Sequence, residues 1–158
     1  MYRDFYRIEV NDLIILEAKG KITEANNKTN LIHRFDVPEG VNKLVIKYSY
    51  SPRILEDREK AVRLVKECYE KYGEKIIGRP SDDLPVKNLV TLSVDENGAY
   101  RGAAHRHADR QEHIIGKDFA SPGFLKGEIH QGEWDIVLNV HSVSCDVDYQ
   151  ITVEGDEE

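Results

Sequence analysis

Apolar and polar side chains alternate strictly in the stretch Val147-Asp148-Tyr149-Gln150-Ile151-Thr152-Val153-Glu154. Successive side chains of a strand point to opposite faces, so this pattern predicts a β-strand with one buried and one wet face. The same period of two occurs in residues 134–141, 44–50 and 31–37, and residues 89–94 are apolar on both faces. Shorter strand candidates are residues 5–10, 12–22, 74–77, 99–104 and 111–115.

Turn signals separate these short strands. Asp95-Glu96-Asn97-Gly98 is a turn by composition, because Asn and Gly tolerate a positive φ. Many short strands spaced by turns are typical of antiparallel sandwiches. The sequence therefore predicts a mostly all-β chain that forms an antiparallel β-sandwich with a jelly-roll-like arrangement.

One segment, residues 54–73, follows a helical period instead. Val62, Val65 and Tyr69 fall on one stripe, and charged residues fill the opposite face. Glu56 stands four residues before Lys60, a spacing that favours an ion pair on a helix. We expect one α-helix inserted between strands, where it closes an open end or edge of the sandwich.

The chain shows no linker, repeat or low-complexity tract. We therefore expect a single domain over residues 1–154, followed by a frayed acidic tail over residues 155–158.

The composition argues against several classes of partner. The 158 residues include 22 Lys and Arg against 29 Asp and Glu, a formal net charge of −7. Phosphate backbones need clustered cations, so we expect no nucleic-acid partner. The longest apolar run, residues 13–16, is far too short for a membrane span, so we expect no membrane partner. With two cysteines and no apolar signal segment near Met1, we expect a cytoplasmic protein without a disulfide framework.

The densest polar region is residues 100–113, which hold three of the six histidines. On a strand, His105 and His107 would share a face, and His113 could return from the next strand. Imidazole and carboxylate ligands suit zinc, manganese or iron. A divalent metal such as zinc at these three histidines is therefore one hypothesis. The alternative is a solvated polar hairpin that needs no cofactor.

The arginines of the same region suggest anion binding. Arg101, Arg106 and Arg110 could hold a carboxylate or phosphate through bidentate hydrogen bonds. The alternative is that they pair with acids of the chain itself, and exposed pairs of that kind contribute only about 0–1 kcal/mol each.

Residues 120–129 contain two glycines and a proline, which specify a loop of defined shape. Ser121 at its start is not expected to be a nucleophile, because no Gly-x-Ser-x-Gly elbow surrounds it and no companion base is evident. No other catalytic residues are evident either. We expect Ser121 to be a turn hydroxyl or, if this loop binds a ligand, one of its contacts.

Several segments together carry a family resemblance. They are residues 33–41, residues 44–52, Asn97-Gly98-Ala99-Tyr100-Arg101-Gly102, Arg110, Ala120-Ser121-Pro122-Gly123-Phe124, Gly127, residues 132–138 and residues 148–153. The chain resembles the accessory β-domain that precedes the catalytic domain in PHP-type metallohydrolases of the carbaryl-hydrolase (CehA/McbA) branch. The resemblance implies a β-sandwich and carries no catalytic residues, because the metal ligands of that family belong to its PHP domain. His105-Arg106-His107 is similar to the PHP His-x-His motif but falls inside the accessory-domain pattern, so the resemblance implies no metal there.

The leading hypothesis is a non-catalytic β-sandwich module, accessory to a PHP-type hydrolase, that binds a partner protein or a small anionic or carbohydrate ligand. The expected ligand contacts are Arg101, His105, Arg106, His107, Arg110 and Ser121. Two alternatives stay open. One is a small metal-binding protein or metallohydrolase that uses the histidine cluster. The other is a structural subunit that forms homo-oligomers or assembles with a separately encoded hydrolase.

Overall fold

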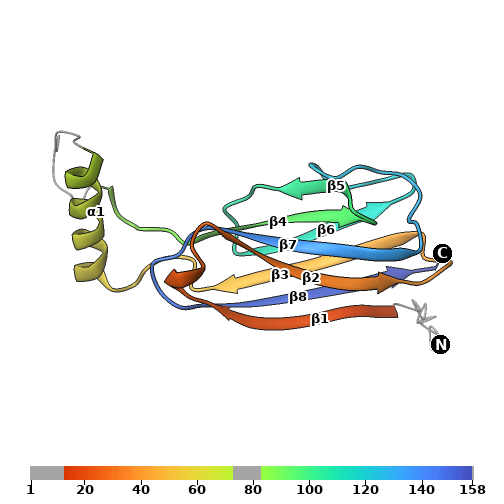
Figure 1. Ribbon diagram of the computed structural model, residues 1–158, viewed down its shortest axis with the longest axis horizontal. Coiled ribbons are helices and arrows are strands. Elements are labelled where there is room, and N and C mark those ends of the chain that lie inside the picture. The colour runs from red at the N-terminus through yellow and green to blue at the C-terminus, as the bar shows by residue number, and fades with distance from the viewer. Residues whose placement is uncertain (1–12, 73–82, 158) are drawn as a thin grey trace, which may run out of the picture.

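The computed structural model describes residues 13–72 and 83–157, and within them the chain forms two packed four-stranded sheets (Figure 1). The strands are β1 (Leu13–Ile22), β2 (Thr29–Val37), β3 (Lys43–Ser51), β4 (Leu89–Glu96), β5 (Ala99–Ala104), β6 (Arg110–Gly116), β7 (Gly132–Ser142) and β8 (Val147–Asp156). A 3-10 turn, η1 (Glu24–Asn26), follows β1, and the helix α1 (Arg58–Tyr72) lies between β3 and β4. These strands confirm the prediction from alternation. The candidates at residues 5–10 and 74–77 lie outside the described residues.

The strand order is β1-β8-β3-β6 in one sheet and β2-β7-β4-β5 in the other, with antiparallel pairing throughout. Successive strands mostly alternate between the two sheets, as in an eight-stranded jelly roll. The expected sandwich with a jelly-roll-like arrangement is therefore confirmed.

The core lies between the sheets and consists of the apolar sets that alternate in the sequence. Ile46 of β3 and Ile151 of β8 face Leu92 of β4 and Leu138 of β7, and all four are fully buried. Burial of one such side chain contributes about 1.5–3 kcal/mol. The polar residues between them form the outer face of each sheet.

The turn between β4 and β5 is a tight hairpin. Asn97 has a φ of 48° and Gly98 a φ of 82°, so both central residues adopt the left-handed conformation that this turn requires. The Asn97 side chain also accepts the backbone N–H of Glu133 at 2.9 Å, which ties the turn to β7.

The helix begins later than the predicted residues 54–73. It starts at Arg58 because the carboxylate of Asp57 accepts the backbone N–H of Lys60 at 3.0 Å and caps the first turn. Lys60 pairs with Glu24 of η1 at 2.5 Å, not with Glu56 as the helical spacing suggested. Residues 54 and 55 instead pair with residues 86 and 87 of the returning chain.

The helix does not cover the sandwich. It lies beyond one end of the sheets (Figure 1), and Ala61 is the buried residue among its fifteen. The expectation that α1 closes an open end or edge is therefore wrong for the described residues. Within those residues, no helix combines the length and the apolar character needed to cross a bilayer.

The expected frayed tail is also shorter than predicted. Strand β8 continues through Gly155 and Asp156, because it lies between β1 and β3 and is hydrogen-bonded on both sides. Asp156 also forms an ion pair with Lys43 at 3.3 Å.

One side of the sandwich is closed by the loop of residues 117–131, which connects β6 to β7. It pairs with β6 through Ile115 and Ala120 and with β5 through Gly102 and Phe124, and these strands are edges of different sheets. Gly102 has a φ of +139°, and a Cβ atom there would lie 2.5 Å from the Cα atom of Phe124. The close approach of loop and strand therefore requires glycine at this position.

We predict that Gly102→Ala lowers the free energy of unfolding by about 2–4 kcal/mol, because the methyl group adds a clash to an unfavourable φ. Gly40→Ala is the matched control, since Gly40 has a φ of +91° in open space. The control should lose about 1–2 kcal/mol from backbone strain alone. Equal losses in urea unfolding would contradict the close packing of loop on strand.

Candidate functional site

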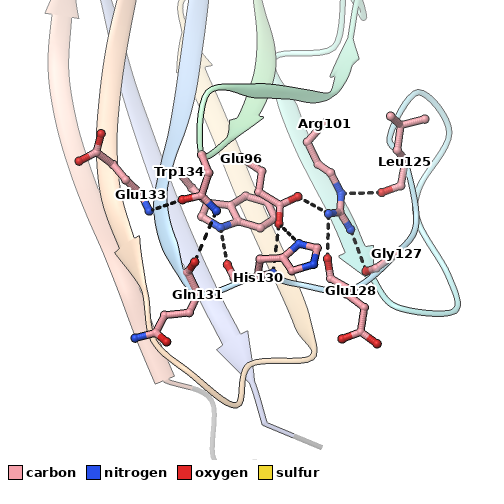
Figure 2. A network of polar contacts seen from close by, with 10 residues as sticks. Glu96, Arg101, Leu125, Gly127, Glu128, His130, Gln131, Glu133 and Trp134 are labelled. Atoms are coloured by element: carbon pink, nitrogen blue, oxygen red, sulfur yellow. Dashed lines mark hydrogen bonds and ion pairs between the residues drawn. The ribbon is translucent and has the colours of Figure 1, made fainter.

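Arg101, the first expected ligand contact, is buried at the side of the sandwich. Its Nε donates to the carbonyl of Leu125 at 2.8 Å, its Nη2 to that of Gly127 at 2.8 Å and its Nη1 to that of Glu128 at 2.9 Å. Nη1 also forms an ion pair with the carboxylate of Glu96 (Figure 2). The guanidinium thus clamps the loop of residues 117–131 and is not available to a ligand, which corrects the prediction for Arg101.

The inward aim of Arg101 has a local cause. Gly102 pairs with Val94 and Tyr100 pairs with Asp95, so Arg101 is the extra residue of a β-bulge in β5. A bulge interrupts the regular alternation of inward and outward side chains along a strand. Here it lets the side chain of Arg101 point inward.

Glu96 links Arg101 to His130. Its other oxygen accepts the backbone N–H of His130 at 3.1 Å and lies 2.5 Å from His130 Nδ1. Trp134 Nε1 in turn donates to the carbonyl of His130 at 2.9 Å. Burial alone would raise the pKa of Glu96, but the hydrogen bonds from His130 and Arg101 outweigh it and hold the pKa below its usual range.

Sequence reasoning missed the role of Glu96 and His130. A signal was present, because Val90, Leu92 and Val94 mark the inward face of β4 and Glu96 is the next residue on that face. A charged residue at an inward position needs a charged or hydrogen-bonding partner.

Ser121 also serves the fold. Its Oγ accepts the backbone N–H of Ile114 at 2.8 Å, and its own N–H donates to the carbonyl of Ile114 at 2.8 Å. The hydroxyl therefore joins the loop to β6, and the expected role of Ser121 as a ligand contact stays a prediction.

The structure does not assemble His105, His107 and His113 into a metal site. Strand β5 ends at Ala104, so His105 and His107 lie in the exposed connection to β6 rather than on one face of a strand. His113 is fully buried, with Nε2 2.8 Å from Gln111 Oε1 and its ring packed on Phe124. Among residues 13–72 and 83–157, no group of three or more His, Cys, Asp or Glu side chains is arranged to hold a metal ion.

Arg106 and Arg110 remain accessible, and they face different surroundings. Arg106 is exposed in the β5–β6 connection with His105 and His107. Arg110 opens β6 and points to the outer face of the β1-β8-β3-β6 sheet, where a hollow of about 690 Å³ lies. A second hollow of about 530 Å³ adjoins the first and shares Ser49, Arg110 and Gln150 with it.

A row of polar side chains crosses this hollow from one edge of the sheet to the other. The register pairs Lys19 with Gln150, Gln150 with Ser49, and Ser49 with Arg110, so four strands each contribute one member. We call Lys19, Gln150, Ser49 and Arg110 the polar row. Lys21 lies beside it on β1 and also lines the hollow.

Among the described residues, the cations of the hollow have no acidic ion-pair partner. Lys19, Lys21 and Arg110 form no ion pair with any residue of the described part of the chain. Two acids, Asp109 and Asp148, line the same hollow. Both lie outside the polar row, so the row itself carries two positive charges and no negative one.

Comparison with known proteins adds no assignment: no protein-family model matches the chain, and no curated protein is significantly similar to it.

We predict that Arg101→Lys lowers the free energy of unfolding by about 3 kcal/mol, because an ammonium cannot satisfy three carbonyls and a carboxylate in the same geometry. Arg34→Lys is the control, since Arg34 makes a bidentate but exposed pair with Asp135. That control should cost less than about 1 kcal/mol. A similar small loss for both variants in urea unfolding would contradict the clamp.

A second prediction concerns pH. Burial, and to a smaller extent the charge of Arg106, lowers the pKa of His113 to about 4. The unfolded chain takes up a proton at this residue near pH 6.5, whereas the folded chain does not until about pH 4. The free energy of unfolding should therefore fall as the pH is lowered through this window, by up to about 1.4 kcal/mol per pH unit from His113.

The variant His113→Gln should flatten this pH dependence, whereas His107→Gln in the exposed connection should leave it unchanged. Burial also lowers the pKa of His33, so a smaller slope of the same sign remains in His113→Gln. A pH dependence in His113→Gln as steep as in the parent chain would contradict the buried neutral imidazole.

Proposed function

We propose that this chain is a non-catalytic binding module that takes a small anionic ligand in the hollow of the β1-β8-β3-β6 sheet. The observation that carries the proposal is the set of three cations, Lys19, Lys21 and Arg110, that line this hollow without an ion-pair partner among the described residues. Elsewhere on the same face, cations are neutralised: Lys47 pairs with Glu154 at 3.2 Å.

The dimensions fit a small or short, elongated ligand. A volume of about 690 Å³ lies within the range of small-molecule sites. Neighbouring strands are about 4.8 Å apart, so the backbones of Lys19 and Arg110 lie about 14 Å apart across the polar row. Both side chains are long enough to reach inward, and Gln150 and Ser49 offer hydrogen-bonding groups between them. Arg110 can hold a carboxylate or phosphate through two parallel hydrogen bonds.

The hollow suits an anion better than a neutral sugar. Neutral sugars are commonly held against an aromatic face. Tyr50 and Tyr149 do line the hollow, but both side chains are directed towards the core. Tyr50 is 3% exposed and its hydroxyl donates to the carbonyl of Asn88, while Tyr149 packs against the core. Asp109 and Asp148 would repel an anion at their side of the hollow, which directs it to the polar row.

The resemblance to accessory domains supports the non-catalytic part of the proposal. Of the residues that carry it, Arg101, Gly102 and Ser121 have structural roles in holding the loop of residues 117–131. Arg110 differs from them, because it is exposed and free to bind. On this proposal the module serves a PHP-type hydrolase by binding an anionic ligand beside it.

The test is a titration of the isotope-labelled chain with inorganic phosphate and, separately, with citrate, followed by amide NMR shifts. At an ionic strength of about 0.01 M, where screening is weak, we expect saturable shifts at residues 19, 49, 110 and 150. Arg110→Gln should weaken binding about tenfold, a loss of about 1.4 kcal/mol. The binding of phosphate and of citrate should also weaken as the salt concentration is raised.

Arg63→Gln provides the matched control, because it removes the same charge from the exposed surface of α1. It should leave the affinity within about twofold of the parent chain, a difference of about 0.4 kcal/mol. The proposal fails if neither anion shifts the polar row, or if both variants lose affinity equally, which would indicate a response to net charge alone.

A further inference from the structure

Two histidines meet on the outer face of the opposite sheet. The rings of His105, just after β5, and His141 of β7 have centroids 6.3 Å apart in an edge-on arrangement. Both side chains belong to exposed residues. His105 is one of the histidines that the sequence suggested for metal binding, but its neighbour in the structure is a residue that the sequence did not suggest.

The order of the strands in the sheet explains why the two rings lie close together. Strand β4 lies between β5 and β7, and its register pairs Leu92 with Ala104 on one side and Thr91 with Asn139 on the other. His105 follows Ala104 and therefore comes level with Thr91, while His141 lies two residues beyond Asn139. The two rings thus approach each other across Thr91.

The hydroxyl of Thr91 can orient the ring of His141 for metal binding. Its hydroxyl lies 2.8 Å from His141 Nε2. When Nε2 carries the proton and donates it to this oxygen, Nδ1 keeps a free lone pair. Histidines that bind metals usually donate their other ring N–H to an oxygen in this way, which fixes both tautomer and ring orientation.

We propose that His105 and His141 together bind one divalent transition-metal ion that favours imidazole, such as Zn²⁺ or Cu²⁺, with water at the remaining positions. Metal–nitrogen bonds of about 2.0–2.1 Å with tetrahedral angles would place the ring centroids about 5 Å apart. The observed 6.3 Å requires an approach of about 1 Å. His105 can make it because it lies in the connection after β5 rather than within the strand. This site is separate from the anion-binding hollow and does not depend on it.

Isothermal titration of the untagged full chain with Zn²⁺ alone, in a buffer that does not chelate metals, tests the proposal. We expect one equivalent to bind. His105→Asn and His141→Asn should each weaken binding at least tenfold, since each removes one of two protein ligands. His107→Asn is the matched control, because it removes a neighbouring exposed imidazole, and it should change the affinity less than twofold.

Two further measurements separate this site from general histidine binding. Thr91→Val should weaken binding severalfold while both ligands remain, because it removes the oxygen that orients His141. Binding should also weaken as the pH is lowered, because metal-binding imidazoles must be deprotonated and protons therefore compete with Zn²⁺.

The proposal is overturned if the parent chain binds no Zn²⁺, if His141→Asn binds as well as the parent, or if His107→Asn loses as much affinity as His105→Asn. Thermal unfolding of each variant without metal confirms that a loss of binding does not reflect a loss of structure.

Discussion

The buried pair of Arg101 and Glu96 is the constraint on which one whole side of this sandwich depends. A buried guanidinium is stable only when its donors are satisfied, and here the carbonyls of Leu125, Gly127 and Glu128 supply the partners that Glu96 alone cannot. The loop of residues 117–131 must therefore lie against β5 and β6. In that position it places Phe124 on the ring of His113 and keeps this imidazole dry and neutral at ordinary pH. Three of the polar residues that looked functional in the sequence, Arg101, Ser121 and His113, thus serve to close the fold.

The alternation of apolar and polar residues was sufficient to predict the strands, because a period of two residues indicates a β-strand with one buried face. It failed at the ends of elements. The helix, capped by Asp57, begins at Arg58, four residues after the predicted start at residue 54. Pairing of β8 with its neighbouring strands keeps Gly155 and Asp156 in a strand despite their acidic neighbours. The ends of helices and strands depend on capping side chains and on neighbouring strands, and the periodicity of the sequence does not show these contacts.

The candidate sites were harder to predict, for a related reason. Arg101 and Arg110 look alike in the sequence, but a β-bulge turns the first inward and regular alternation turns the second outward. The polar row draws on four strands, and only the sheet order makes Lys19 and Arg110 members of one surface. His105 likewise finds His141 across β4, whereas its sequence neighbour His107 has no such position. Neither surface forms a contiguous motif, so no spacing rule could have found it.

Native-state hydrogen exchange tests directly whether Arg101 and Glu96 are structural residues rather than ligand contacts. The amides of Leu125, Gly127 and Ala103 all donate across the junction between the loop of residues 117–131 and the strands. If Arg101 and Glu96 hold this loop as part of the core, these amides exchange as slowly as those of the central strands β3 and β7. Exchange as fast as that of the exposed connection at residues 105–108 would contradict the account, because Arg101 would then be free to act as a ligand contact.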